Sequence, residues 1–216
     1  MMTLLLPNTS QAILKSEEEF NRVMGIKYVT QLEFINSKAQ NTVIKKCRKA
    51  LDKGLFDPRQ KWLGSYYSQE ILGCRDPDLD LTIAWIDPVF GYGVFTNQPI
   101  RAHTYVGEYM GVVRKNRFFG RSKNFYCFDY TIGFGLDTPF VIDAQSAGNY
   151  TRYINHSDKP NLETASVFCN GIMHMIMYAL CDIPKGTQLC YDYGFHYWER
   201  RKNPLPLEAR ATTLLD

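Results

Sequence analysis

The sequence predicts a mostly β domain preceded by a helical N-terminal segment. From Leu81 onward, runs rich in β-branched and aromatic residues are separated by Gly, Pro, Asn and charged residues, a pattern typical of short strands. These runs are LTIAWI (81–86), TYVGEYMGVV (104–113), FYCFDYTI (125–132) and FVIDA (140–144). Asn170-Gly171, between two further runs, predicts a tight hairpin because both residues tolerate the positive φ that such a turn needs. The 14 tyrosines and 13 phenylalanines also favour strands.

Two helical patterns come before the strands. Ser16 and Glu19 have the spacing of a capping box, and apolar residues then recur at roughly helical intervals as far as Ile35. A second pattern ends at Gly54 and has an apolar side and a basic side. The basic side consists of Lys45, Lys46, Arg48, Lys49 and Lys53. The predicted units are the helical segment (1–78), the β domain (79–200) and a C-terminal tail (201–216).

Length and composition are those of an ordinary globular chain. Its 216 residues can bury a sizeable core, and 45% hydrophobic with 22% charged residues is a common balance. The formal charge of +3 selects no class of partner. The apolar run Leu4–Leu6 ends at Pro7, which is too short for a signal-peptide core or a membrane span. We therefore expect no membrane association.

The cysteines and histidines indicate a reduced protein without a metal site. The six cysteines include no CxxC pair, and several lie in strand-like runs, where a thiol behaves as a small apolar group. This usage is typical of an intracellular chain without disulfides or structural zinc. Three of the four histidines also lack ligand spacing; these are His103, His174 and His196.

Several blocks of residues carry the functional signal. In Gly91-Tyr92-Gly93, two glycines let the backbone approach a ligand closely, although the tripeptide alone is more typical of a plain tight turn. The later blocks are GEYMGVV (107–113), YCFDY (126–130), IDAQSAGNYTRYINHSDKPN (142–161) and ALCDIPKGTQLCYDYG (179–194). Each block alone also fits a structural role. In this order and over this length, the blocks resemble the signature of SET-domain protein lysine methyltransferases.

The resemblance implies a fold and a reaction. The fold would be the SET-domain fold of small antiparallel sheets, with the Gly-Asn and Asn-His-Ser elements threaded under another loop as a pseudoknot. The reaction would be transfer of a methyl group from S-adenosylmethionine (SAM) to a lysine amine. The resemblance covers residues 82–200 and leaves the helical segment unexplained.

The resemblance also implies which residues bind the cofactor. Main-chain atoms of Gly91-Tyr92-Gly93 would contact the methionine part of SAM. Asn155 would bind its amino-acid end, and His156 would hold the adenine through main-chain bonds. Arg152 would brace the threaded segment, and Tyr126 would lie near the cofactor.

On the substrate side, Tyr193 occupies the position of the catalytic tyrosine, and Tyr109 would line the lysine channel. Asp129 would lie near the substrate groove. Tyr191 stands where the family has Tyr or Phe, and a Tyr resembles members that stop at monomethylation, because its hydroxyl crowds and hydrogen-bonds the amine. We therefore predict mainly monomethylation.

Tyrosines suit this chemistry for a physical reason. The lysine amine has an unperturbed pKa near 10.4, so exposing its lone pair at pH 7 costs about 4–5 kcal/mol. A sulfonium cation and a low-dielectric channel both disfavour the charged ammonium and offset part of that cost. A neutral phenol can then orient the amine without competing as a nucleophile, while its ring faces the positive charge favourably.

The chain departs from many eukaryotic members of the family. They place a Cys directly after Asn-His-Ser, which joins three later cysteines to bind zinc; here that residue is Asp158, and no cysteine follows Cys190. Another element must then close the site, and we expect Trp198 to stack on the adenine and Phe195 to close the lysine channel. This zinc-free form resembles SET proteins of bacteria that live inside eukaryotic cells. It implies a bacterial cytoplasmic protein that is secreted into a host cell and reaches its nucleus.

The partner expected from the resemblance is a lysine-bearing protein, either a histone or a histone-like protein. A homodimer through the helical segment is a further expectation. The alternative function is a catalytically weak SET scaffold that binds proteins. The basic side over residues 45–53 could also contact nucleic acid, with steep salt dependence. A solvated helix face accounts for it more simply, so we do not expect direct nucleic-acid binding.

Overall fold

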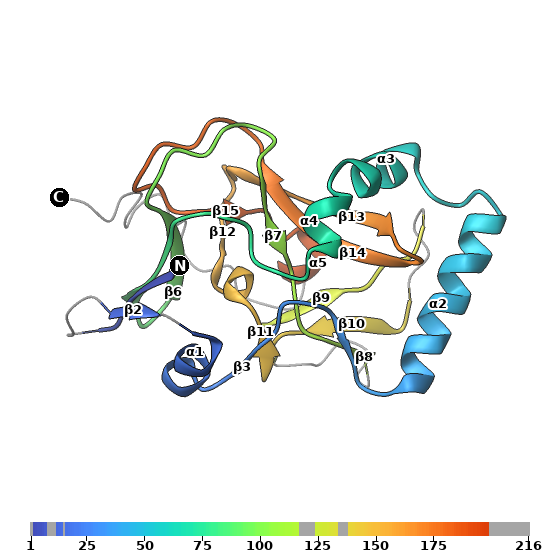
Figure 1. The fold of residues 1–216 in the computed structure, drawn as a ribbon, viewed down its shortest axis with the longest axis horizontal. Helices are drawn as coiled ribbons and strands as arrows, with labels where there is room; N and C mark the ends of the chain where they lie inside the picture. The colour runs from blue at the N-terminus through green and yellow to red at the C-terminus, as the bar shows by residue number, and fades with distance from the viewer. Residues whose placement is uncertain (1, 8–11, 15, 117–123, 134–137, 199–216) are drawn as a thin grey trace.

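The computed structural model describes residues 2–7, 12–14, 16–116, 124–133 and 138–198 (Figure 1). The predicted C-terminal tail lies outside the described residues. The helices are α1 (Glu17–Met24), α2 (Ser37–Asp52), α3 (Pro58–Tyr66), α4 (Ser68–Leu72), the 3₁₀ helix η1 (Tyr150–Tyr153) and α5 (Phe195–Trp198). No helix in these ranges is long and apolar enough to cross a membrane.

Small β-sheets are the main regular structure of the described chain, as predicted. The first eight strands are β1 (Met2–Leu5), β2 (Ala12–Leu14), β3 (Lys27–Tyr28), β4 (Glu33–Phe34), β5 (Leu81–Asp87), β6 (Gly91–Thr96), β7 (Tyr105–Glu108) and β8 (Val112–Lys115). The others are β9 (Cys127–Asp129), β10 (Phe140–Asp143), β11 (Ala147–Gly148), β12 (Asn155–His156), β13 (Leu162–Cys169), β14 (Ile172–Ala179) and β15 (Cys190–Tyr191). They form sheets in the orders β2-β1-β5-β6, β4-β8-β10-β9, β13-β14-β7, β11-β3 and β12-β15.

The first predicted helix is correct at its start and wrong at its end. Ser16 caps α1 by accepting a hydrogen bond from the Glu19 amide, as the capping pattern predicts. The helix then ends at Gly25, whose φ of 68° stops the helical path, so the apolar pattern beyond it belongs to short strands instead. Tyr28 is nevertheless buried, because β3 returns it to Phe20 with ring centroids 4.7 Å apart.

The helical N-terminal segment also contributes strands to the sheets of the β domain. The strand β1 pairs parallel with β5, β3 with β11, and β4 with β8. Together with β12–β15, these are the parallel pairs; the other strand pairs are antiparallel, in keeping with the predicted small, mostly antiparallel sheets. Buried residues of α1 and α2, such as Phe20 and Val43, share one core with Ile142 and Met173 of the β domain. The segment is therefore built into the domain.

The predicted hairpin is confirmed. Strands β13 and β14 pair antiparallel up to Cys169 opposite Ile172, and the two turn residues Asn170 and Gly171 have φ values of 46° and 85°. The strand β14 lies between β13 and β7, and all but its first residue are buried. The strand carries apolar residues on both faces, which fits a strand that is covered on both sides.

A glycine allows α3 to lie directly on β13. A Cβ atom added to Gly64 would lie 2.1 Å from the carbonyl oxygen of Phe168, which is part of the strand backbone. We expect Gly64→Ala to lower the free energy of unfolding by about 1–3 kcal/mol, because α3 must move off the strand. Gly73→Ala is the matched control: Gly73 is exposed and has the helical φ of −65°, and its added Cβ would lie 3.0 Å from the Gln69 carbonyl oxygen, against 2.1 Å at Gly64. We expect urea denaturation to show a clearly smaller loss for Gly73→Ala than for Gly64→Ala. Equal stability of both variants would contradict this packing.

None of the six cysteines, all within the described residues, forms a disulfide. Burial raises the pKa of Cys47 to about 11 and that of Cys190 to about 12, so both stay protonated near neutral pH. They behave as apolar core residues, as the sequence suggested.

Candidate active site

The centre of the site is the parallel pair β12–β15, which brings the Asn-His-Ser turn beside the Tyr-Asp-Tyr segment. Asn155 lies opposite Cys190, and His156 lies opposite Tyr191. Two hydrogen bonds then fix Tyr193: its amide donates to His156 Nδ1 at 3.1 Å, and its hydroxyl donates to the carbonyl oxygen of Ile154 at 2.9 Å. The phenol is thus held beside Asn155, although the two residues lie 38 positions apart.

The glycine turn joins the same place. The side-chain amide of Asn155 donates to the carbonyl oxygen of Tyr92 at 3.0 Å, which links the turn to β12. Gly91 has a φ of 69°, which favours glycine. A Cβ atom on Gly93 would lie 2.6 Å from the side-chain nitrogen of Gln188. The two glycines therefore set the turn's conformation and its close packing.

Arg152 braces this part of the chain from within. Its side chain is buried, and Nε donates to the carbonyl oxygen of Ala144 at 2.8 Å. Its guanidinium carbon lies 3.7 Å from the ring centroid of Tyr126 and 4.6 Å from that of Tyr153. These distances are within the range of cation–π attraction, which replaces part of the hydration that the buried charge loses.

A chain of aromatic rings, which we call the aromatic cluster, extends from Tyr193 into the protein. Its members are Tyr109, Phe128, Tyr191, Tyr193, Tyr197 and Trp198. Centroid distances are 5.4 Å for Tyr109–Phe128, 6.2 Å for Phe128–Tyr191 and 4.7 Å for Tyr191–Tyr193. The cluster is thus a continuous apolar lining with phenol hydroxyls set into it.

Burial keeps the phenols of this lining neutral. Desolvation raises the pKa of Tyr193 well above 10, and the neighbouring Tyr191 and Tyr197 raise it further. Desolvation likewise raises the pKa values of Tyr109 and Tyr191. At neutral pH these hydroxyls can donate hydrogen bonds and orient a bound group, but they cannot act as strong bases.

The short helix α5 covers the outer side of Tyr193. The Trp198 ring lies nearly parallel to that of Tyr193, with an interplanar angle of 9° and centroids 6.0 Å apart, and 4.9 Å from the His156 ring. Its indole Nε1 is buried and has no hydrogen-bond partner among the described residues. The ring of Phe195 is 75% exposed.

The comparison with known proteins identifies this arrangement. The family model for the SET domain matches residues 91–194, from the glycine turn to the glycine after Tyr193. Residues 91–194 are a SET domain.

Relatives of known activity match the same region. The chain is 39% identical to histone-lysine N-methyltransferase ash1 of Drosophila melanogaster over 107 residues, and this alignment covers 49% of the chain. It is 33% identical to histone-lysine N-methyltransferase 2B of Homo sapiens over 129 residues, or 57% of this chain. The chain spans 5% of the length of each of these relatives. Among solved structures, that of Arabidopsis thaliana SUVH6 in complex with SAM aligns with this chain at 29% sequence identity and a TM-score of 0.48. The alignment covers 56% of this chain and 28% of the SUVH6 chain.

The SET domain brings most of the sequence-predicted residues together. Contacts link the glycine turn, Asn155, His156 and Tyr193, and Arg152 with Tyr126. Others link Tyr191 with Tyr193, and Tyr193 with Trp198. Tyr109 joins them through Phe128. Their catalytic and binding roles stay predictions, because these contacts give position only.

Asp129 is placed differently from its neighbours. It is exposed, and it follows Phe128 in β9, where successive side chains point to opposite faces. Since Phe128 points into the aromatic cluster, Asp129 points away from it. Its place at the substrate groove stays a prediction.

Two residues at the site were not singled out from the sequence. Phe128 bridges Tyr109 and Tyr191, and Tyr153 lies between Arg152 and Tyr92, 5.7 Å from the Tyr92 ring. Phe128 could have been predicted from the sequence, because in an extended strand it shares a face with Tyr126, two residues earlier. The role of Tyr153 depends on contacts with distant segments, which a single sequence does not encode locally.

His156 has a side-chain role that the resemblance did not imply. Because its Nδ1 accepts from the Tyr193 amide, Nε2 carries the proton, and Nε2 lies 3.2 Å from a carboxylate oxygen of Asp158. Asp158 stands at the position where the zinc-binding members have Cys. In this chain it orients the imidazole that holds Tyr193.

We expect Asp158→Ala to lower kcat of the proposed methyl transfer about threefold to tenfold, the equivalent of one hydrogen bond. The change should fall on kcat more than on KM, because the contact orients Tyr193. Asp158→Asn retains an acceptor oxygen and should stay within about twofold of the natural chain. Steady-state kinetics of all three proteins checks this; a loss as large in the Asn variant as in the Ala variant would contradict it.

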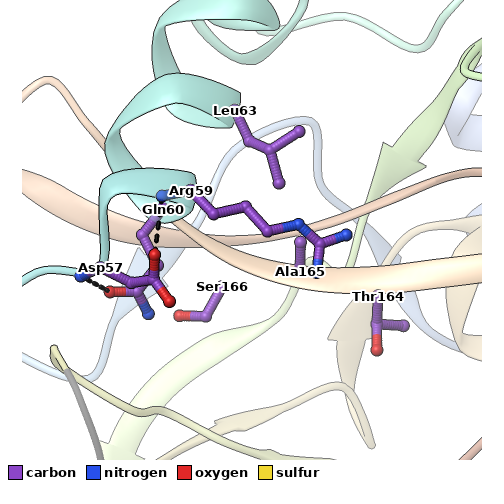
Figure 2. Close-up of a pocket in the computed structure, with 7 residues that line it drawn as sticks. All are labelled: Asp57, Arg59, Gln60, Leu63, Thr164, Ala165 and Ser166. Carbon is purple, nitrogen blue, oxygen red and sulfur yellow. Dashed lines mark hydrogen bonds between the residues drawn. The ribbon is translucent and has the colours of Figure 1, made fainter.

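The possible metal ligands and a small pocket complete the description. Within the described residues no group of three or more His, Cys, Asp or Glu side chains could hold a metal ion. A small pocket lies between the start of α3 and β13 (Figure 2). It is lined by Asp57, Arg59, Gln60, Leu63, Thr164, Ala165 and Ser166. It shares no residue with the aromatic cluster, and the Arg59 guanidinium already binds Glu163 and Tyr178.

Proposed function

We propose that this chain is a SAM-dependent protein lysine N-methyltransferase that mainly monomethylates lysines of histones or histone-like proteins. The observation that carries the proposal is the position of Tyr193. Its neutral phenol is fixed next to Asn155, and Asn155 is bonded to the glycine turn. The reported activity of the relatives supports the reaction class.

The residues at the site fit SAM. The main chain of residues 91–93, the Asn155 amide and the unpartnered Trp198 Nε1 offer polar contacts beside apolar rings. This combination suits a ligand that joins an amino acid to a nucleoside. When bound, SAM supplies an electrophilic methyl group on a sulfonium.

The protein's own contribution would be orientation and desolvation. The aromatic cluster excludes water from the lysine side chain, which favours the neutral amine over the ammonium. The Tyr193 hydroxyl, together with the Ile154 carbonyl that it binds, fixes the geometry for in-line attack. The raised pKa of Tyr193 means that the amine's proton leaves to water and not to the phenol.

The experiment is transfer of a labelled methyl group from SAM to core histones and to a bacterial histone-like protein, followed by mass spectrometry. We expect labelled monomethyl-lysine. SAM binding without incorporation into any of these proteins would favour the alternative, a catalytically weak scaffold that binds proteins. The helical segment would then be the candidate for partner or homodimer contacts, which sedimentation would test.

Tyr191 would set how many methyl groups are added to the lysine. This phenol is buried between Phe128 and Tyr193, so its hydroxyl takes up room beside the expected amine position. We expect Tyr191→Phe to shift the product from monomethyl-lysine toward dimethyl- and trimethyl-lysine with little loss of the first methyl transfer. Mass spectrometry of the products at long reaction times measures this. Trimethyl-lysine as the dominant product of the natural chain would contradict it.

The setting is also part of the proposal. Asp158, which stands where the zinc-binding members have Cys, supports a compact bacterial form acting first in a bacterial cytoplasm and then in a host cell. Detection of the chain in fractionated infected cells would test this part independently of the chemistry.

A further inference from the structure

The helix α2 carries a row of cations that the proposed function does not use. Its buried face consists of Ala39, Val43, Cys47 and Ala50. With 3.6 residues per turn, Lys38, Lys45 and Lys49 fall within about 40° of one another on an exposed side of the helix, and Lys53, the residue after the helix, lies about 40° further round. Lys46 and Arg48 flank this row. All six side chains are exposed. Because the apolar face is anchored in the core, the row is held on a rigid support.

The charge is concentrated on this helix. Residues 37–53 contain six cations and one carboxylate, which is a net charge of +5. The whole chain has a net charge of +3, so the rest of it is net −2. None of the six cations forms an ion pair with another residue that the structure describes. The row is therefore a concentrated positive surface on the part of the chain that the structure describes.

Helix stability does not account for the row. Cations in the last turn, such as Lys49, interact favourably with the helix dipole, but Lys38 lies in the first turn, where a cation is unfavourable. The first turn contains no acidic residue to offset it. Pairs of like charge along the row, such as Lys45 with Lys49, also weaken an isolated helix. A partner that neutralises the row would remove these costs.

Against the expectation from the sequence alone, we propose that α2 is a docking surface for double-stranded DNA, because the structure anchors the helix in the core and leaves its cations exposed. The helix is about 24 Å long, and DNA offers about one phosphate charge per 1.7 Å of axis, so a straight row of lysines can face several phosphates at once. An acidic protein would need carboxylates arranged to match the row, whereas a duplex offers uniform charge of any sequence. The helix lies at the edge of the molecule, at the opposite end of its long axis from the N-terminus, where a duplex can approach it (Figure 1).

The surface would have a use in the proposed reaction. Histones and histone-like proteins are carried on DNA, so a contact with the duplex would keep the enzyme close to its lysines. This link rests on the proposed function, but DNA binding itself does not. The helix is separated from β12 and β15 along the molecule's long axis, so the duplex would not cover the active site (Figure 1).

The test is binding of a fluorescent duplex of about 30 base pairs, measured by anisotropy between 50 and 200 mM NaCl. We expect binding that weakens steeply with salt. A variant with Lys38, Lys45, Lys49 and Lys53 changed to Gln should reduce the slope of log K against log salt by about 3 to 4, since each phosphate contact contributes about 0.9. Its affinity at the lowest salt should fall at least about tenfold. Gln keeps a similar helix propensity, and circular dichroism would check the fold.

The matched control loses the same charge elsewhere. It carries Gln at Arg22, Arg75, Arg101 and Lys185, which are exposed and lie outside α2. We expect it to bind DNA within about twofold of the natural chain, apart from the change in long-range attraction. The proposal would be overturned if both variants lost the same DNA affinity, or if the natural chain did not bind DNA at 50 mM NaCl. It would also be overturned if the natural chain bound polyglutamate but not DNA. SAM binding measured on the same proteins separates this result from failure of the proposed enzyme function.

Discussion

Tyr193→Phe is expected to lower kcat of methyl transfer by about 100-fold or more, while SAM binding stays within about threefold. The Phe ring can still pack against Tyr191, Tyr197 and Trp198, so the aromatic cluster should keep its shape. What is lost is the hydroxyl that fixes the Ile154 carbonyl and orients the amine. Because the loss concerns the reacting geometry, it should fall on kcat and not on KM.

Single-turnover transfer from labelled SAM, with calorimetric SAM binding on the same protein, measures both effects. Tyr178→Phe is the matched control, because its hydroxyl bonds Arg59 and Glu163 away from the aromatic cluster. It should leave kcat unchanged. If Tyr193→Phe is as active as Tyr178→Phe, then Tyr193 has no part in the reaction.

His174→Leu is expected to lower the free energy of unfolding by about 3–5 kcal/mol. His174 Nδ1 lies 2.9 Å from the Glu108 carboxylate, whose side chain is 1% exposed, so the substitution leaves a buried carboxylate without this partner. Glu108 also positions the site, because its carbonyl oxygen accepts hydrogen bonds from Asn149 and Thr151 just before Arg152. Partial unfolding of β7 would therefore reach the active site.

Urea denaturation of single and double variants separates the cause. Glu108→Gln with His174→Leu removes the charge as well as the histidine, so it should be more stable than His174→Leu alone. If the double variant were less stable than His174→Leu alone, then lost packing, and not the unpaired carboxylate, would account for the lower free energy of unfolding.

The sequence predicted the parts of this site that depend on local residue order. The glycine turn, the Asn-His-Ser turn and the Tyr-Asp-Tyr strand end can be read one block at a time, and the structure brings all three together. The Asn170-Gly171 hairpin could be predicted for the same reason, since its conformation is set by two adjacent residues. Local chemistry of this kind needs no knowledge of the rest of the chain.

What the sequence did not predict depends on contacts between distant segments. The apolar pattern predicts helix through β3 and β4, because two-residue strands have no periodicity of their own and form only by pairing with β11 and β8. The outward direction of Asp129 follows from the register of β9 on β10. The Asp158–His156–Tyr193 contacts were also missed, since only the parallel pairing of β12 with β15 brings these side chains together.

The most direct test of the central claim is a crystal structure of the chain with SAM or its demethylated product. We predict that the ligand lies against the main chain of Gly91-Tyr92-Gly93 and the Asn155 side chain, with its sulfur on the side that faces the Tyr193 hydroxyl. A ligand bound elsewhere, or one whose sulfur faces away from Tyr193, would contradict the assignment of this site to methyl transfer.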